Sequence, residues 1–457
     1  MTKIVICIDG TGNEIGDRES NVLKLYKAMR KDDQQLAQYV MGVGTFDGTQ
    51  YMGRARQAVN ALLGQAFGYG LEDDVLTAYR FLCRNYRSKD RKQKEDTGLS
   101  DAAAESDHIY LCGFSRGAYA ARILAGFVHN FGLVAPDKLH LIVPVFRAYR
   151  RVTDADPSDK DAKVFKALRE YEAVLSPEPA AIRALLLFDT VSSLIRFRRP
   201  FYNLRKHASF AEFGTHASVN SNVSVRIVLH ALAWHERRSL FRPQLWNPKP
   251  EDRSEKAPDG EPLYYGNNFR VPARERIQQV RQRWFSGFHS DVGGSPPEDQ
   301  SGLGKISLLW MLDALSDAEK AADAQDNAAR KKARKGPLPG RRQYGLKLKT
   351  GARKSYLEGQ DPDKKTPGGL PYVGPDAEAP LHDSHKHGAL AWLWVVLEFF
   401  PKSLRRRETG PVKWYRRGWL IAWYLPLFEP RQAHPEQEVD PSLRTRLSQD
   451  RDHQTPR

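Results

Sequence analysis

The sequence has few cysteines and no long apolar run, and both absences limit what the protein can be. Only three cysteines occur among 457 residues, at positions 7, 83 and 112. So sparse and odd a set supplies neither a disulfide framework nor a CxxC metal site. Cys7 and Cys112 lie within apolar runs, which predicts buried thiols. No apolar run reaches the roughly 18 residues that a membrane-spanning helix needs.

The N-terminus lacks the features of a signal peptide. Its first residues, MTKIVICIDGTGN, hold neither a charged start, nor a long apolar segment, nor a cleavage site. The apolar run at residues 4–8 has the length of a strand instead. We therefore expect synthesis in the cytoplasm without such a signal.

Composition excludes a disordered chain and indicates anionic partners. Hydrophobic residues make up 40% of the chain and include nine tryptophans, enough for a sizeable core. Lysine and arginine number 71 against 55 acidic residues, which leaves a net charge of +16. Such an excess favours nucleic acid, acidic lipid or a phosphorylated substrate.

The excess charge is concentrated in one segment. Residues 330–354 contain eleven lysines or arginines and no acidic residue. Together with its glycines and prolines, this composition predicts a basic loop or linker over residues 323–380. Nucleic-acid binding would need interleaved aromatic residues or a recognised binding fold, and neither is evident. We therefore expect nucleic acid to be the least favoured of the anionic partners.

Short apolar runs alternate with helical patterns through the first 322 residues. Strands separated by helices predict βαβ units and a mostly parallel sheet in a single α/β domain. A mostly helical segment at 132–180 is either an ordinary crossover or a cap over the site. The predicted strands are 4–8, 39–43, 109–112, 184–188, 225–232 and 284–288, and the clearest helical patterns are 71–82, 118–128 and 306–322.

The C-terminal region, residues 381–457, has a different character. Five of the nine tryptophans lie between Trp392 and Trp423, and clusters of arginine lie among them. Tryptophan beside arginine is the composition of a bilayer interface. The alternative is a helical appendage that packs on the core.

A candidate nucleophile follows the third predicted strand. The segment Gly113-Phe114-Ser115-Arg116-Gly117 matches G-x-S-x-G between a strand and a helix. This arrangement places a serine on a sharp exposed turn, where Gly113 and Gly117 allow neighbouring backbone to approach closely. The helix N-terminus would favour a developing oxyanion. The pattern predicts Ser115 as the nucleophile; the alternative is a tight turn in a Rossmann-like sheet.

The remaining members of a triad are predicted from chain order. In this type of fold the serine precedes an acid, and a histidine comes last. Asp189 follows a predicted strand, where parallel sheets place active sites, and His289 follows another strand in a glycine-containing loop. Asp291 either orients that loop or competes with Asp189 for the role of the acid.

The loop Asp9-Gly10-Thr11-Gly12-Asn13 follows the first strand. An aspartyl phosphatase would need an aspartate where Cys7 stands, so we exclude that function. We expect an oxyanion loop instead, in which a backbone N–H of Thr11 or Gly12 joins the N–H of Arg116, with Asp9 in a supporting role.

Other histidines offer alternatives to His289. His235 also follows a strand, whereas His382, His385 and His387 cluster near the apolar C-terminal segment. The spacing of these three could suit a metal, but no further ligand is evident. We expect surface or interface histidines there, and neither a metal nor a cofactor.

Together these motifs resemble the catalytic domain of type VI secretion phospholipase effectors and their bacterial and fungal relatives, all α/β hydrolases. The matches run in order across residues 4–311. The principal ones are Asp9-Gly10-Thr11-Gly12, Gly113-Phe114-Ser115-Arg116-Gly117, Phe188-Asp189-Thr190-Val191 and His289-Ser290-Asp291-Val292-Gly293-Gly294.

The resemblance implies hydrolysis of lipid esters, phospholipids above all, with Ser115 as nucleophile, Asp189 as acid and His289 as base. It also implies a secretion effector delivered to a target cell, with secretion machinery or an immunity protein as partner and peripheral contact with an anionic membrane. The chain departs from the family at His235, where a carboxylate is common, and it has no evident delivery domain. Two alternatives stay open: an esterase or amidase for a soluble substrate, and a non-catalytic binding protein on a hydrolase scaffold.

Overall fold

The computed structural model describes most of the regular elements of the chain. The described residues are 1–10, 18–42, 70–95, 105–152, 163–191, 224–246, 278–332, 343–386, 391–399, 423–431 and 437–453, with short pieces at 195–197, 211–213, 219, 222, 255–256, 262–264, 271–272, 334, 336–338, 402–403 and 433.

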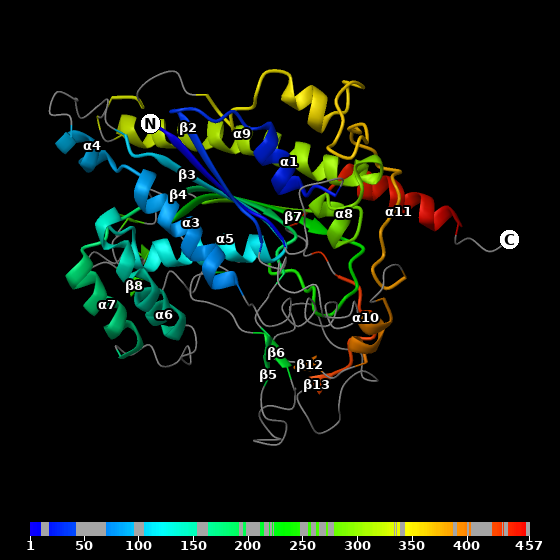
Figure 1. The fold of residues 1–457 in the computed structure, drawn as a ribbon, viewed down its shortest axis with the longest axis horizontal. Helices are drawn as coiled ribbons and strands as arrows, with labels where there is room; N and C mark the ends of the chain where they lie inside the picture. Colours follow the sequence, from blue (N-terminus) through cyan, green and yellow to red (C-terminus); the bar gives the residue numbers. More distant parts are fainter. Residues whose placement is uncertain are drawn as a thin grey trace.

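A seven-stranded sheet forms the centre of the molecule (Figure 1). Its order is β14-β11-β7-β4-β3-β1-β2, and every neighbouring pair is parallel. This arrangement confirms the predicted α/β fold with a mostly parallel sheet. The strands are β1 Lys3–Ile8, β2 Gln35–Val40, β3 His108–Phe114, β4 Ile182–Phe188, β7 Val225–Ala233, β11 Gln279–Phe285 and β14 Glu438–Val439.

Two strands lie a few residues earlier in the chain than the apolar runs predict. The second predicted strand, 39–43, is β2, and the sixth, 284–288, is β11. In β11 only Trp284 and Phe285 are buried, and the five preceding residues are half-buried and mostly polar. Apolar content therefore marks only the end of this strand, whereas backbone pairing with β7 begins at Gln279.

Helices cover both faces of the sheet, and β1 explains why. Ile4, Ile6 and Ile8 belong to one buried cluster, whereas Val5 and Cys7 belong to another on the opposite face. Successive strand side chains point to opposite faces, so an uninterrupted apolar strand requires helices on both. The helices are α1 Asn21–Ala28, α3 Leu71–Asn85, α4 Lys89–Glu95, α5 Arg116–Phe131, α6 Ile142–Val152, α7 Lys163–Leu175, α8 His289–Gly293, α9 Gly302–Lys332, α10 Ala391–Leu397 and α11 Pro441–His453.

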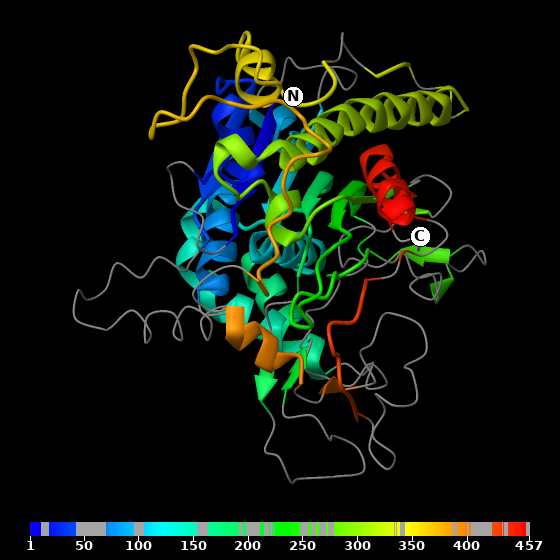
Figure 2. The same ribbon diagram turned by 90° about the vertical axis from the view of Figure 1, so that its right-hand side faces the viewer.

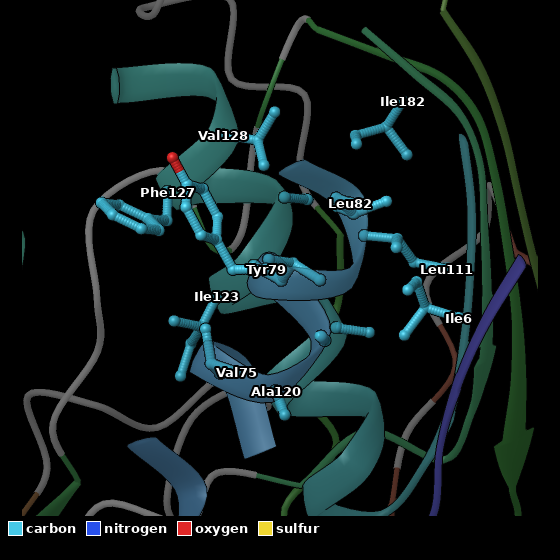
Figure 3. Close-up of a cluster of buried hydrophobic side chains, with 14 of the residues drawn as sticks. Ile6, Val75, Tyr79, Leu82, Leu111, Ala120, Ile123, Phe127, Val128 and Ile182 are labelled. Atoms are coloured by element: carbon cyan, nitrogen blue, oxygen red, sulfur yellow. The ribbon is translucent and has the colours of Figure 1, made fainter. Parts of the chain in front are cut away.

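Helices α3 and α5 pack on one face of the sheet, and α1 and α9 pack on the other (Figure 1). Figure 3 shows the buried cluster that contains Tyr79 of α3 and Phe127 of α5 together with Ile6 and Leu111 of the sheet. From the predicted crossover or cap at 132–180, Phe146 and Tyr149 of α6 pack against Phe127. The crossover helices thus lie on the α5 face of the sheet.

The prediction of a basic loop or linker over residues 323–380 is wrong for the first part of that segment. Helix α9 continues past residue 322 to Lys332. The apolar pattern ends near 322, but Asp323 binds Arg183 of β4 at 2.7 Å and Asp326 binds Arg226 of β7 at 2.9 Å. Ion pairs to the sheet therefore hold the part of the helix that lacks apolar spacing.

The later part of that segment packs on the domain. Leu346 and Leu357 belong to the buried cluster of α1 and α9, and Leu348 forms a β-bridge with Met29. Residues 343–357 are therefore part of the core rather than a free connection, although most of their charged side chains remain at the surface.

The C-terminal region also contributes to the domain. Strand β14 pairs with β11 and extends the sheet by one strand, so the region is not wholly helical. Helix α10 (orange) lies away from α9 in both views (Figures 1 and 2). No helix among the described residues is long and apolar enough to cross a membrane.

Candidate active site

Ser115 occupies a strained turn between β3 and α5. Its backbone has φ 56° and ψ −122°, a conformation that a residue with a Cβ rarely adopts. The backbone N–H of Ser115 donates to the carbonyl of Phe188 at the end of β4, at 3.0 Å. This bond to the neighbouring strand holds the turn at the carboxyl edge of the sheet.

Two glycines make this turn possible. A Cβ on Gly117 would collide with the carbonyl oxygens of Ile8 and Asp9, and a Cβ on Gly113 would collide with the backbone of Gly117 and its successor. The end of β1 therefore lies directly against the start of α5. This close approach is the physical reason for glycine at both positions of the G-x-S-x-G motif.

The structure brings Ser115, His289 and Asp189 together in one hydrogen-bonded chain. His289 Nε2 lies 2.8 Å from Ser115 Oγ, and His289 Nδ1 lies 2.5 Å from Asp189 Oδ2. The three residues follow β3, β4 and β11, all at the carboxyl edge of the sheet. All three are buried, with Asp189 fully so.

Electrostatics favour a neutral imidazole beside an ionised carboxylate. Burial lowers the pKa of His289 below its usual 6.5, although the bond to Asp189 opposes that change. Burial alone would favour a neutral Asp189. The charge of Arg431 and the bond to His289 outweigh it and hold the pKa of Asp189 below its usual range. His289 is thus a base that can accept a proton from the Ser115 hydroxyl.

Packing fixes the imidazole of His289 between two aromatic rings. The ring centroids of Phe114 and Phe241 each lie 4.8 Å from that of His289. The backbone N–H of His289 also donates weakly to Glu236 Oε2 at 3.3 Å. These contacts limit the ring to one orientation.

Asp291 orients the loop that carries His289. One of its oxygens accepts from the backbone N–H of Phe288 at 2.8 Å, and the other binds His382 Nδ1 at 2.6 Å. Asp189, by contrast, is the carboxylate in contact with His289. Of the two alternatives for Asp291, the geometry therefore favours loop orientation.

Asp9 organises the residues that follow β1. It accepts hydrogen bonds from the N–H of Gly10 at 2.6 Å, the hydroxyl of Ser20 at 2.5 Å and the hydroxyl of Tyr39 at 2.7 Å. The predicted oxyanion residues Thr11 and Gly12 lie outside the described residues. Arg116, the third, begins α5 directly after Ser115, and burial lowers the pKa of its guanidinium to about 10.

His235, one of the alternatives to His289, connects two strand ends. Its Nδ1 accepts from the N–H of Gly287 at 2.9 Å, and its own N–H donates to the Gly287 carbonyl at 3.0 Å. The next residue, Glu236, is a fully buried carboxylate paired with Arg238 at 2.7 Å. Although burial favours the neutral acid, Arg238 lowers the pKa of Glu236 to about 2.

Sequence reasoning missed two charged groups near Ser115, His289 and Asp189. Glu236 could have been found, because it is an acidic residue just after a strand that ends at the active edge. Arg431 gave no local signal: it lies far along the chain in the region expected to be an appendage. In the part of the chain that the structure describes, no group of histidine, cysteine and acidic residues could hold a metal ion.

Residues 2–314 match the model of the family described as T6SS phospholipase effector Tle1-like, catalytic domain. A curated relative, the uncharacterized protein YEL023C of Saccharomyces cerevisiae, is 26% identical over 263 residues, which is 54% of this chain and 33% of that protein.

Two solved structures also resemble the chain. An uncharacterized protein from Pseudomonas aeruginosa has 18% identity and a TM-score of 0.34 over 74% of this chain and 51% of that one. The Tle1 effector bound to the VgrG spike of the type 6 secretion system has 17% identity and a TM-score of 0.30 over 66% and 52%. The chain thus spans between a third and about half of the length of these relatives.

Proposed function

The chain belongs to the Tle1-like phospholipase effector family, and from this premise we propose that it is a serine hydrolase acting on carboxylic esters of lipids, phospholipids above all. The observation that carries the proposal is the hydrogen-bonded chain Ser115–His289–Asp189 on a strained strand-to-helix turn. Family membership supports the lipid substrate, and the geometry supports the serine mechanism.

The proposed mechanism assigns one task to each residue. Ser115 Oγ attacks the acyl carbonyl while His289 Nε2 takes the hydroxyl proton, and the alcohol then leaves with that proton. Asp189 holds the imidazole in the tautomer with a proton on Nδ1 and stabilises the imidazolium. Water, activated by the same histidine, then releases the fatty acid and restores Ser115.

The oxyanion would be held by backbone N–H groups. The N–H of Arg116 lies at the first position of α5, where the helix N-terminus favours negative charge. We propose that Thr11 or Gly12 supplies the second donor, because the carbonyls of Ile8 and Asp9 already lie against Gly117. The N–H of Gly10 is bonded to the Asp9 carboxylate instead.

We expect the purified protein to react at Ser115 with a fluorophosphonate and to release fatty acid from phospholipid vesicles. Activated serines attack such probes, whereas ordinary serines do not. Labelling is checked by mass spectrometry and release by lipid-class profiling. Hydrolysis of short soluble esters without phospholipid hydrolysis would favour the soluble-substrate alternative. The absence of both labelling and hydrolysis would favour a non-catalytic binding protein.

Helix α10 supports contact with a membrane surface. Trp392 and Val396 of α10 are 63% and 42% exposed and lie about one helical turn apart on its outer side, and Phe399, just after the helix, is 56% exposed. On the inner side Trp394 packs edge-on against Phe241, which in turn packs on His289. Basic residues follow α10 in the sequence. We propose that this outer side binds an anionic bilayer next to the active site.

Replacing Trp392 and Phe399 with serine is expected to weaken binding to anionic vesicles at least about tenfold, because each buried aromatic contributes about 1.5–3 kcal/mol. Co-sedimentation with phosphatidylglycerol vesicles at low salt measures the change. Val174→Ser is the matched control, since Val174 is 71% exposed on α7. Equal binding by the wild type, the Trp392 and Phe399 variant and Val174→Ser would contradict a docking role for α10.

The same family membership supports delivery by a type VI secretion system. We therefore propose a secretion-spike protein as a partner, and an immunity protein as its inhibitor in the producing cell. Anionic lipid, rather than nucleic acid, remains the proposed polyanionic partner.

A further inference from the structure

Arg431 lies well beyond the matched residues 2–314, yet its guanidinium reaches the triad carboxylate. Arg431 Nη1 lies 2.6 Å from Asp189 Oδ1, and Nη2 lies 3.1 Å from Oδ2. We propose that Arg431 is a positioning residue for the Ser115–His289–Asp189 chain, so that the C-terminal segment completes the active site. This inference rests on the proposed hydrolase function.

The contacts of Asp189 show what the arginine adds. Oδ1 also accepts from the N–H of Ala233 at 3.0 Å, and Oδ2 also faces His289 Nδ1 at 2.5 Å. A rigid guanidinium fork binds both oxygens of a carboxylate in one plane. Arg431 therefore fixes the direction in which Oδ2 faces the imidazole.

Arg431 is itself held in one place. Its guanidinium donates to the carbonyl of Ala233 at 2.7 Å and to the backbone carbonyl of Phe241. The side-chain ring of Phe241 in turn packs on His289. Only 6% of the residue is exposed, so its charge faces a fully buried carboxylate without intervening solvent. The end of β7 and the loop that carries Phe241 are thus tied to one side chain.

Glu398 positions the segment that carries Arg431. Its carboxylate accepts from the N–H of Ser239 at 2.6 Å and from the N–H of Phe428 at 3.3 Å, and its carbonyl accepts from Leu427. Leu427 and Phe428 have φ of 47° and 56°, a conformation that costs energy without glycine. Glu398 is buried directly after α10, so its contacts connect this helix to the segment that carries Arg431.

The charge of Arg431 has two opposite effects on the reaction. It keeps Asp189 ionised in a buried site, but it opposes the positive charge that His289 gains when it takes the serine proton. The other charged groups that face His289 are Glu236 and Arg238, which are paired with each other. Loss of Arg431 should therefore misplace Asp189 and at the same time make His289 more basic.

The test compares Arg431→Met, Arg431→Lys and Arg444→Met in the full chain. Arg444 is exposed on α11 and serves as the matched control. The pH dependence of kcat and KM is measured on p-nitrophenyl butyrate, with circular dichroism as a check on folding. In serine proteases, kcat falls about 10⁴-fold when the triad acid no longer holds the histidine in the correct tautomer. Because Ala233 and His289 still hold Asp189, we expect a loss of about 10- to 100-fold in kcat for Arg431→Met.

The pH profile separates positioning from simple stability. We expect the acid limb of Arg431→Met to move to higher pH, because the pKa of His289 rises when the positive charge is removed. Arg431→Lys should keep that midpoint but lose part of kcat, since an ammonium cannot form the fork. KM should change little in both variants, and Arg444→Met should match the wild type.

Two results would overturn the inference, and a third concerns only the proposed function. Wild-type kcat and an unmoved acid limb in Arg431→Met would show that Asp189 needs no such support. If that variant fails to fold, a folded Arg431→Lys with wild-type kcat would lead to the same conclusion. A wild-type protein that hydrolyses no ester and takes no fluorophosphonate would instead refute the proposed hydrolase function.

Discussion

Replacing Ser115 with alanine is expected to reduce ester hydrolysis on the order of 10⁶-fold, the loss seen when the nucleophile of a comparable triad is removed. The reason is that His289 Nε2 has a single oxygen, Ser115 Oγ, to activate at 2.8 Å. A water molecule in its place would lack the fixed position that the strained turn gives the hydroxyl. The initial rate on p-nitrophenyl butyrate and the fatty acid released from phospholipid vesicles measure the loss.

The alanine variant should fold as well as the parent. The hydroxyl makes a hydrogen bond only to the imidazole among the bonds described, and alanine carries the same Cβ through the strained backbone. Ser448→Ala, an exposed serine of α11, is the matched control and should keep full activity. Hydrolysis by folded Ser115→Ala at the parental rate would exclude Ser115 as the nucleophile.

Asp189→Asn is expected to lower both activity and stability, for different reasons. Activity should fall about 10⁴-fold, because an amide can donate to His289 Nδ1 and so favours the wrong tautomer. Stability should fall by about 3–5 kcal/mol, because the buried guanidinium of Arg431 loses its counter-charge. Initial rates measure the first effect, and urea unfolding measures the second.

A double substitution distinguishes the two effects. In Asp189→Asn with Arg431→Met no unpaired charge remains, so we expect most of the stability to return while activity stays low. The two substitutions should therefore be strongly non-additive in unfolding free energy. If the single and double variants unfold at the same urea concentration, the buried ion pair does not govern stability at this site.

Much of the fold, and the three residues of the proposed triad, could be predicted from local patterns. An apolar strand such as β1 requires cover on both faces, and a strand followed by G-x-S-x-G and a helix predicts the sharp turn that Ser115 occupies. Asp189 and His289 could be proposed because each comes shortly after a predicted strand of a parallel sheet. Parallel strands end at one edge, so residues after them meet there.

The prediction of structure from sequence failed in segments that lack regularly spaced apolar residues. Helix α9 continues to Lys332 because acidic side chains such as Asp323 bind arginines of the sheet, and such pairs leave no periodic pattern. The segment 343–357 was expected to be a linker because it is basic and contains glycine. Its few apolar residues, including Leu346 and Leu357, are nevertheless buried.

The sequence by itself indicated the class of fold, the sharp turn at Ser115 and the candidates Asp189 and His289, because each is marked by a short apolar strand and the residues that come soon after it. Only the tertiary structure decided that Arg431 contacts Asp189 and that Glu398 holds the segment before it. Nothing around one arginine among 71 basic residues distinguishes it, since its partner Asp189 lies 242 positions earlier in the chain. The partner of a buried charged group is set by the tertiary fold, which depends on the path of the whole chain.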